Sequence, residues 1–253
     1  MLPVLQLGPL AIRVPGLVVL AGLWLGLEAA SRAGSRRDLS PDRIYALGFW
    51  SIAGGAIAAR AGFVLANQSI YQQIQPAERA LLSIISPAPG TEIEWIGLLA
   101  SLAIAALLAT RWKIPPLDLA DAFTPGLAVM AIGVSIANLL SGEAYGVETA
   151  LPWGVDLWGA HRHPVQVYTG LAFAAIFVGL WRCQTRPSPA GTLAQWFLIL
   201  SGVTVLLIEP LRADSPTLWA GIRTPQVIAL IVMLIGLGAF IYRAPSSSKP
   251  APP

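Results

Sequence analysis

Residues 193–208, LAQWFLILSGVTVLLI, contain no charged side chain and few polar ones. A helix needs about 20 predominantly apolar residues to cross the hydrocarbon core of a bilayer, so we interpret this run as the centre of a transmembrane helix. Comparable runs recur along the chain at residues 14–30, 44–66, 95–110, 117–140, 164–181 and 225–242. The sequence therefore predicts an all-α integral membrane protein, a bundle of about seven transmembrane helices.

Composition supports a membrane protein over a soluble one. The 253 residues are 55% hydrophobic and only 11% charged, whereas a soluble domain carries roughly a quarter charged residues. The mean hydropathy of +0.67 is too high for one soluble core. An isoelectric point near 9.4 would suggest nucleic acid in a soluble protein. Here the cations lie in short loops between apolar runs and act as topology signals, so we expect no nucleic-acid partner.

The cations are distributed unevenly over alternate loops. Ten lie in loops 31–43, 111–116 and 181–190 and in the tail: Arg32, Arg36, Arg37, Arg43, Arg111, Lys113, Arg182, Arg186, Arg243 and Lys249. Four lie in the intervening loops: Arg79, Arg162, Arg212 and Arg223. The positive-inside rule then places the N-terminus outside and the C-terminus in the cytoplasm. We expect a single polytopic membrane domain over residues 1–243 and a disordered cytoplasmic tail over residues 244–253, which are rich in Ser and Pro.

Polar residues within or beside the apolar runs are candidates for function, because burying them in a bilayer is costly. Arg60 lies among small residues of run 44–66, where it either serves a functional site or extends its side chain to the membrane surface. Glu209 and Arg212 are three residues apart, on one helix face if the helix continues past Pro210, which suits either a site or a structural ion pair. Asn138 suits either an interhelical hydrogen bond or a contact with a lipid head group.

His163-Pro164 begins the run 164–181, and Gln166 and Tyr168 follow in its first turn. Proline near the first helical position is an ordinary helix-start signal. A helix N-terminus also attracts phosphate through its free N–H groups, and the neighbouring Arg162 strengthens that interpretation. A histidine, with an ordinary pKa of about 6.5, can act as a general base.

Neither a disulfide nor a metal site is expected. Cys183 is the single cysteine, which excludes an internal disulfide and a multi-cysteine metal site. His161 and His163 are two residues apart, a spacing that does not place them on one helix face. The sequence contains no phosphate-binding glycine loop and no nucleophile elbow, so we expect no cofactor.

Six short motifs together resemble one family. They are Leu7-Gly8-Pro9-Leu10-Ala11-Ile12-Arg13, Ala59-Arg60-Ala61-Gly62-Phe63, Lys113-Ile114-Pro115, NLLSGEAYG at 138–146, Arg162-His163-Pro164-Val165-Gln166-Val167-Tyr168, and Glu209-Pro210-Leu211-Arg212 with Asp214. Motifs similar to these occur in the same order in prolipoprotein diacylglyceryl transferases, and they cover most of the chain.

The resemblance implies a reaction and its partners. Enzymes of this family take diacylglyceryl from phosphatidylglycerol, attach it to the thiol of a lipobox cysteine on a secreted precursor, and release glycerol phosphate. The family fold has seven spans with the N-terminus outside, which agrees with the charge distribution above. The implied partners are phosphatidylglycerol or another anionic phospholipid and a lipobox precursor peptide, and the implied location is the bacterial plasma membrane.

The resemblance also implies roles for individual residues. Arg60, Arg162 and Arg212 are expected to hold phosphate, and Asn138 and Glu143 to position the head group. His163 is expected to assist the thiol, so that His163, Arg60 and Arg212 form the catalytic set. The remaining residues expected to bind substrate are Gly146, Gln166, Tyr168 and Glu209.

Five positions depart from the family pattern. Ser135 stands where the family signature has an arginine, and Val205 where the sixth span has another. Trp95, Pro15 and Thr169 stand where the family has a histidine, a tyrosine and a glutamate. Because these changes remove two cations, two alternatives to the transfer reaction stay open. One is a non-catalytic homologue that binds phospholipid or a lipoprotein precursor, and the other is a transferase with a different acceptor.

Overall fold

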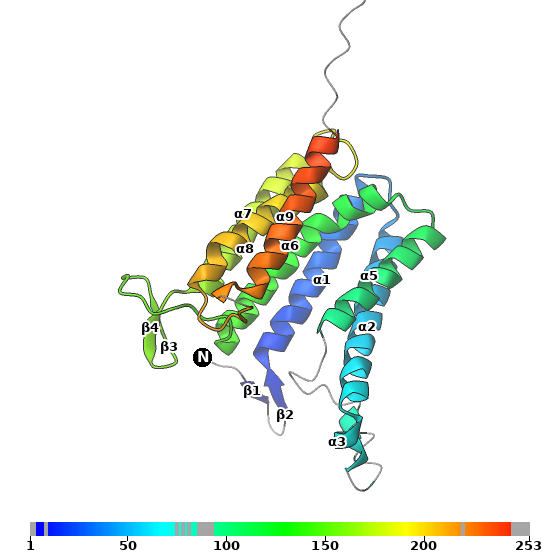
Figure 1. Cartoon of the computed structure of the whole chain (residues 1–253). Coiled ribbons are helices and arrows are strands. Elements are labelled where there is room, and N and C mark those ends of the chain that lie inside the picture. Colours follow the sequence, from blue (N-terminus) through cyan, green and yellow to red (C-terminus); the bar gives the residue numbers. More distant parts are fainter. Residues whose placement is uncertain are drawn as a thin grey trace, which may run out of the picture. The chain divides into compact units, whose positions relative to one another are not determined.

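The structure, a computed structural model, describes residues 4–7, 10–73, 76, 79, 82–84, 94–218 and 221–243. It divides into two compact units (Figure 1). The first comprises Met1–Asp38 and Leu117–Pro253, and the second comprises Leu39–Pro116. The predicted disordered tail, residues 244–253, lies outside the described residues.

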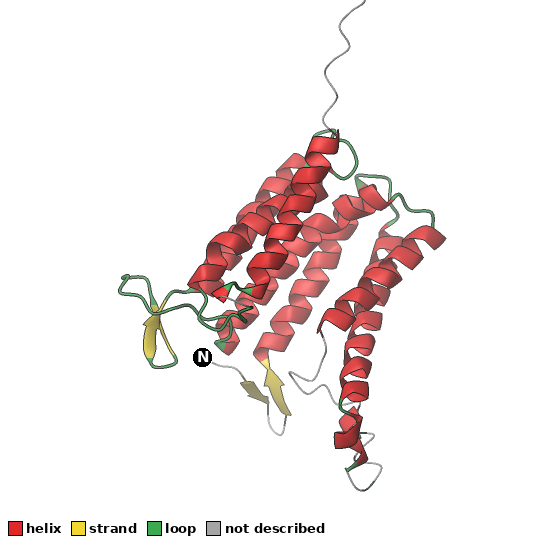
Figure 2. Ribbon diagram, viewed as in Figure 1, coloured by secondary structure: helices red, strands yellow, loops and turns green. Residues whose placement is uncertain are grey.

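Helices make up most of the described chain (Figure 2). In the first unit they are α1 (Val14–Ser35), α6 (Pro116–Ser141, beginning at the boundary), α7 (Val165–Cys183), α8 (Thr192–Ile208) and α9 (Thr224–Arg243). A 3-10 turn, η1 (Glu209–Leu211), continues α8. The apolar contact between α6, α7 and α8 is formed by Ala128, Phe173, Ile176, Leu180 and Leu193. This contact holds together the three helices that carry most of the candidate site.

The second unit contains α2 (Pro41–Ala66), the short α3 (Gln68–Gln72) and α5 (Glu94–Arg111). Helices α2 and α5 approach closely through glycines. A Cβ added at Gly55 would lie 2.8 Å from the carbonyl oxygen of Gly97, and the hydroxyl of Ser101 donates to the carbonyl of Ser51 at 2.9 Å. Small residues at such contacts are typical of helices packed within a membrane, where close backbone approach replaces hydrophobic burial.

A helix lies at each of the seven predicted apolar runs. Among the described residues, five helical segments are long and apolar enough to cross a membrane: Val14–Ser35, Pro41–Ala66, Pro116–Ser141, Val165–Cys183 and Thr192–Leu211. The apolar helices Trp95–Arg111 and Thr224–Phe240 are shorter. The predicted helical membrane fold is confirmed at this level, while the count of seven crossings and the orientation of the termini stay predictions.

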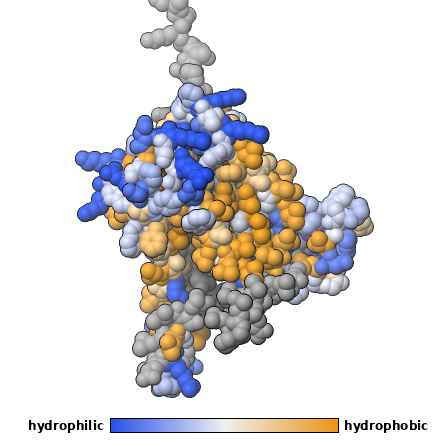
Figure 3. All heavy atoms as spheres, turned by 180° about the vertical axis from the view of Figure 1, so that it is seen from behind, coloured by the Kyte–Doolittle hydropathy of each residue, from blue (hydrophilic) through white to orange (hydrophobic). Residues whose placement is uncertain are grey.

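Large apolar side chains point outward from the helices. Trp24, Ile57 and Leu207 expose 64%, 70% and 70% of their surface, and Figure 3 shows apolar side chains over much of one face. A soluble monomer rarely exposes contiguous apolar surface on this scale, so these side chains suit contact with lipid. The ends of the helices carry compensating charge: Arg32, Arg111 and Arg182 lie in the last turns of α1, α5 and α7.

Two small hairpins were not predicted by the sequence analysis, which expected helices alone. One pairs β1 (Val4–Leu7) with β2 (Leu10–Arg13), and the other pairs β3 (Val155–Leu157) with β4 (Ala160–Arg162). Between β3 and β4, Trp158 and Gly159 have positive φ angles of 54° and 76°. Two consecutive residues of this kind form the tight turn that suits a two-residue hairpin, and so short a strand leaves almost no apolar pattern in the sequence.

Helices α1 and α6 meet through two pairs of glycines. A Cβ at Gly126 would lie 2.4 Å from the carbonyl oxygen of Gly26, and one at Gly133 would lie 3.0 Å from the Cα of Gly22. The backbones are therefore too close for any side chain at Gly126. This contact fixes α6, whose far end carries Ser135 and Asn138.

The Gly126 contact makes a testable prediction. Gly126→Ala should destabilise the protein by about 1–3 kcal/mol, because the added methyl group clashes with backbone rather than with a flexible side chain. Gly179→Ala is the matched control, because nothing lies within 4 Å of its added Cβ; it should be neutral or stabilising, since alanine has the higher helix propensity. Thermal unfolding of the purified proteins in detergent measures both. Equal stability of the two variants would contradict the close contact.

Candidate functional site

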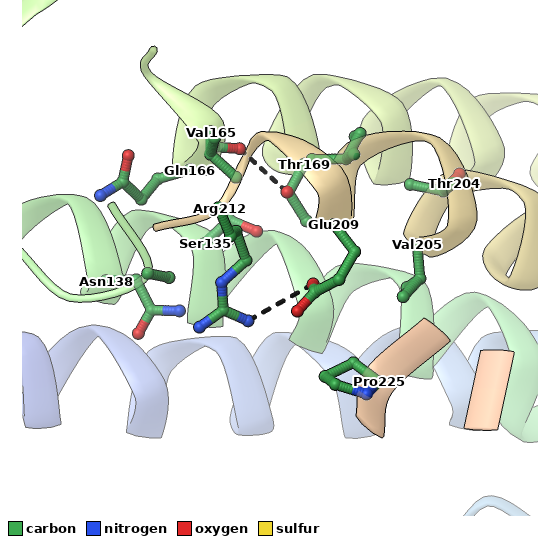
Figure 4. A pocket seen from close by; sticks show the side chains of 12 residues that line it. Ser135, Asn138, Val165, Gln166, Thr169, Thr204, Val205, Glu209, Arg212 and Pro225 are labelled. Atoms are coloured by element: carbon green, nitrogen blue, oxygen red, sulfur yellow. Dashed lines mark hydrogen bonds and ion pairs between the residues drawn. The ribbon is translucent and has the colours of Figure 1, made fainter. Parts of the chain in front are cut away.

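A cavity of about 190 Å³ lies within the first unit, between α6, α7, α8 and the start of α9 (Figure 4). The residues that line it are Ser135, Asn138, Ala144, Val165, Gln166, Thr169, Thr204, Val205, Ile208, Glu209, Arg212 and Pro225. Four of the predicted site residues, Asn138, Gln166, Glu209 and Arg212, are therefore brought together. The cavity combines an apolar wall with a few polar groups, the usual composition of a small-molecule site.

The three hydroxyl groups on the cavity wall donate their protons to their own helices. Ser135 donates to the carbonyl of Ala131 at 2.8 Å, Thr169 to that of Val165 at 2.9 Å, and Thr204 to that of Leu200 at 2.8 Å. A hydroxyl with its proton engaged keeps its lone pairs. These groups therefore accept hydrogen bonds from a ligand more readily than they donate them.

Gln166 adds an unsatisfied acceptor. Its side chain is almost fully buried, with 3% of the residue exposed, and its Nε2 donates to the carbonyl of Glu143 at 2.7 Å. Its Oε1 is buried and has no hydrogen-bond partner among the described residues. A buried acceptor without a partner costs about 1–3 kcal/mol, so a donor on a ligand would stabilise this arrangement.

Glu209 and Arg212 form an ion pair at the edge of the cavity. Glu209 is buried, and its Oε2 lies 3.6 Å from Nη1 of Arg212 (Figure 4). Arg212 also contacts Asp214, from Nη2 at 3.0 Å, and the hydroxyl of Ser215 donates to Oε1 of Glu209. The spacing of three residues correctly predicted that the two side chains meet. Among the described residues, Arg212 is the one cationic residue that lines the cavity.

Arg223 supports this ion pair and was missed as a site residue. Its Nη1 donates to the carbonyl oxygen of Glu209 at 2.6 Å and to that of Arg212. From the sequence, Arg223 was predicted only to be a loop cation. Nothing in the sequence indicates that a loop preceding α9 returns to the end of α8.

The loop after α6 pairs with the segment after α8. Val147 donates to the carbonyl of Leu211 at 2.8 Å, and Ala213 donates to that of Tyr145 at 2.9 Å. Gly146 lies between them, opposite Arg212. A Cβ at Gly146 would lie 2.3 Å from the carbonyl oxygen of His163, so only glycine lets these segments and His163 pack together.

His163 and Tyr168 lie beside this pairing and do not line the cavity. Nδ1 of His163 is 3.3 Å from the hydroxyl of Tyr168, and that hydroxyl accepts a hydrogen bond from Nε1 of Trp153 at 2.8 Å. The backbone N–H of His163 donates to the carbonyl of Val147 at 3.0 Å. The structure thus connects His163 to the site through the loop backbone.

Arg162 makes loop contacts in place of cavity contacts. Its Nε donates to the carbonyl of Leu157 at 3.1 Å and its Nη1 to that of Gly146 at 3.3 Å. Its guanidinium also pairs with Glu148 at 3.6 Å and lies 5.1 Å from the centre of the Tyr145 ring. Through these contacts, Arg162 links the β3–β4 hairpin to the loop after α6. The predicted phosphate contact of Arg162 therefore stays a prediction.

Two further predicted residues also lie off the cavity wall. The side chain of Glu143 is exposed, and its backbone carbonyl is the group that Gln166 binds. Arg60 belongs to the second unit, where its Nε donates to the carbonyl of Ile84 at 2.8 Å and its Nη2 to that of Ser83 at 2.5 Å. There its guanidinium lies 5.8 Å from the centre of the Phe63 ring.

The neighbouring His161 is an exposed residue of the hairpin. Its Nδ1 is 2.8 Å from the carboxylate of Asp156, and its Nε2 is 3.0 Å from the carbonyl of Leu151. The Asp156 carboxylate, with a smaller contribution from Leu151, raises the pKa of His161 above its ordinary value. His161 thus stabilises the hairpin through these two contacts.

Three of the five positions that the sequence analysis interpreted as departures from the family pattern lie in the cavity. Ser135, Thr169 and Val205 are all among its lining residues, although they come from three different helices. Ser135 is buried against α7, where a Cβ added at Gly170 would lie 3.4 Å from its Cβ. The three positions at which the resemblance leads us to expect two arginines and a glutamate thus line one cavity.

Comparison with known proteins identifies the family. The sequence profile of the family described as prolipoprotein diacylglyceryl transferase matches residues 3–242. A protein from Synechococcus elongatus named phosphatidylglycerol–prolipoprotein diacylglyceryl transferase is 29% identical to this chain, over 94% of the chain and 85% of its own length. A Clostridioides difficile protein of the same name is 30% identical, over 90% and 89% of the two chains. One from Finegoldia magna is 26% identical, over 88% and 87%.

The match extends over nearly the whole chain, from the first strand to the last helix. It therefore includes every helix that forms the cavity as well as the loops that close it. The chain belongs to the prolipoprotein diacylglyceryl transferase family.

Proposed function

We propose that this chain transfers diacylglyceryl from phosphatidylglycerol to the cysteine thiol of a lipobox precursor in the bacterial plasma membrane. The observation that carries the proposal is the cavity, in which residues of three of the six family motifs and three positions that depart from the family meet. The relatives named for this reaction match the chain along most of its length. The apolar outer surface of the helices is suited to a lipid donor.

The reaction sets clear chemical requirements. The cysteine sulfur attacks the glyceryl carbon that carries the phosphate, a carbon–sulfur bond forms, and the carbon–oxygen bond breaks. Glycerol phosphate leaves with the bonding electrons, and the thiol proton passes to a base. A free cysteine has a pKa of about 8.5, so a base assists its ionisation. Negative charge that develops on the leaving group needs a cation beside it.

We assign roles on this basis. Arg212 holds the departing phosphate, because it is the cation on the cavity wall among the described residues. Glu209, Arg223 and Asp214 position its guanidinium and backbone. Asn138 and Gln166 bind the head group, and Gly146 and Tyr168 hold the loop that presents His163, the proposed base. The roles implied by the resemblance are kept for three residues that do not line this cavity: Arg162 and, in the second unit, Arg60 hold phosphate, and Glu143 positions the head group.

The departures predict a slow enzyme. Losing one charged contact to a transition state costs about 3–4 kcal/mol, and Ser135 and Val205 each replace such a contact. The side chain of Ser135 supplies a hydrogen-bond acceptor, and that of Val205 supplies no polar group. Arg212 therefore stabilises the leaving phosphate without the two additional cations. This feature also favours the two alternatives, a homologue that binds anionic phospholipid or the precursor without turnover and a transferase with a different acceptor.

We propose seven crossings, with the N-terminus outside and the C-terminus cytoplasmic, as one polytopic domain over residues 1–243 with a disordered tail. The distribution of lysine and arginine between alternate loops supports this orientation. Topology reporters fused after Arg37 and after Lys249 should report the cytoplasm, and one fused at Val155, in the β3–β4 hairpin, should report the outside. A cytoplasmic signal at Val155 would overturn the orientation.

The activity itself gives the second prediction. The purified protein, supplied with labelled phosphatidylglycerol and a lipobox peptide, should release glycerol phosphate more slowly than about 1 per second, a modest rate for an enzyme. The double variant Ser135→Arg/Val205→Arg should be at least about tenfold faster, because both new side chains enter the cavity and one charge contact can supply that factor. Ser135→Gln/Val205→Gln is the matched control, since it adds polar side chains without charge and should not accelerate transfer.

The possible outcomes separate the three candidates. Binding of phosphatidylglycerol without release by the natural protein or the arginine variant would support the non-catalytic homologue. Release at about 1 per second or faster by the natural protein would mean that its charge contacts are complete without Ser135 and Val205. Hydrolysis of the lipid without labelling of the peptide would indicate another acceptor.

A further inference from the structure

A second cavity, of about 610 Å³, lies in the first unit at the other end of α6. The residues that line it are Ala33, Arg36, Arg37, Asp121, Gln184, Thr185, Arg186, Pro187, Ser188 and Leu193. Asp121 and Ser135, which line the two cavities, are separated by about 21 Å along the helix axis at the usual rise per residue. The second cavity is therefore distinct from the candidate site.

The back wall of this cavity is an ion cluster in which one arginine pairs with two aspartates. Arg37 pairs with Asp118 at 2.9 Å and with Asp121 at 2.6 Å. Asp121 is fully buried, and it also accepts hydrogen bonds from the backbone N–H groups of Gly191 at 2.7 Å and Ala194 at 2.8 Å. The carboxylate of Asp121 is thus saturated, and the wall is fixed before any ligand binds.

Two further arginines face the cavity without such partners. The guanidinium of Arg36 lies 4.8 Å from the centre of the Trp181 ring, and Arg186 follows the end of α7. Among the described residues, neither forms a salt bridge with a carboxylate. Stacking on an aromatic ring fixes the plane of a guanidinium and leaves its N–H edge free to bind an anion.

Gln184 supplies the independent sign of a ligand. Both polar atoms of its side chain, Nε2 and Oε1, are buried, and neither has a hydrogen-bond partner among the described residues. A protein rarely buries a donor and an acceptor together without satisfying either. A ligand that presents an acceptor oxygen next to a donor group would satisfy both atoms.

We propose that this second cavity binds the phosphate group of an anionic phospholipid whose head group carries a hydroxyl. Arg36 and Arg186 bind the phosphate oxygens through charge-assisted hydrogen bonds. Nε2 of Gln184 donates to the phosphate as well, and its Oε1 accepts from the head-group hydroxyl. The phosphate lies at an end of an apolar helix bundle, where the acyl chains of the lipid can extend along the outward apolar side chains.

The site would stabilise the fold independently of catalysis. Its lining comes from α1, α6, the loop after α7 and the start of α8, so one bound lipid would connect all four. A ligand that binds only the folded state raises stability in proportion to the logarithm of its concentration. The proposal requires neither turnover nor the proposed role of the first cavity.

The test uses Cys183 as a local reporter, because it is the single cysteine, is exposed and precedes Gln184. The full-length protein is labelled there with an environment-sensitive fluorophore and titrated in neutral detergent with short-chain phosphatidylglycerol. The natural protein should saturate. Arg36→Gln/Arg186→Gln should weaken the apparent affinity by at least about tenfold, since it removes two charge-assisted contacts. Arg182→Gln is the matched control, an exposed arginine beside the label that does not line the cavity, and it should change the affinity less than about twofold by losing only general attraction.

Further arms identify the ligand and challenge the proposal. Phosphatidylethanol, which is anionic like phosphatidylglycerol but has no head-group hydroxyl, should bind more weakly than phosphatidylglycerol to the natural protein and with equal affinity to Gln184→Leu. Inorganic phosphate alone should not produce the signal. If Arg182→Gln and the double variant lost the same apparent affinity for phosphatidylglycerol, the binding would be general electrostatic attraction to the surface, and the proposal would be wrong. Saturation by inorganic phosphate, or no response to phosphatidylglycerol, would also overturn the proposal.

Discussion

The candidate site depends on the backbone pairing between residues 145–147 and 211–213. This pairing joins the loop after α6 to the segment after α8, and it places Gly146 opposite Arg212. Without it, Arg212 and His163 would belong to separate loops at the ends of separate helices. The pairing in turn requires glycine at position 146, because any Cβ there would collide with the backbone of His163. One residue without a side chain thus permits three segments to meet.

The sequence predicted the helices well for a simple physical reason. A membrane-spanning helix must be apolar over about 20 residues whatever it packs against, so its position can be read from composition alone. Local spacing likewise predicted the contact of Glu209 with Arg212. The hairpins, the Arg223 contacts and the buried Oε1 of Gln166 depend on backbone conformation or on segments distant in sequence, and no periodicity encodes them. The hydrogen bonds of Arg162 could not be predicted for the same reason, since their acceptors are the backbone carbonyls of Gly146 and Leu157.

The cavity combines an acceptor-rich wall with one cation, Arg212, among the described residues. Its wall is rich in hydrogen-bond acceptors, because the hydroxyls of Ser135, Thr169 and Thr204 donate to backbone carbonyls of their own helices. Such a wall favours the hydroxyl groups of a glycerol head group over its phosphate oxygens. The phosphate would therefore bind Arg212 at the edge of the cavity, where the guanidinium already forms ion pairs with Glu209 and Asp214. Fold and head-group recognition can therefore be retained while the rate of the chemical step falls.

The most direct test of this account is an experimental structure of the protein with bound phosphatidylglycerol. The account predicts a phosphate beside the guanidinium of Arg212 and a head-group hydroxyl within hydrogen-bond distance, about 2.7–3.2 Å, of Oε1 of Gln166. It also predicts that Gly146 and Arg212 remain paired when the lipid is bound. A head group bound away from this cavity, with Gln166 Oε1 facing only protein or ordered water, would contradict the account.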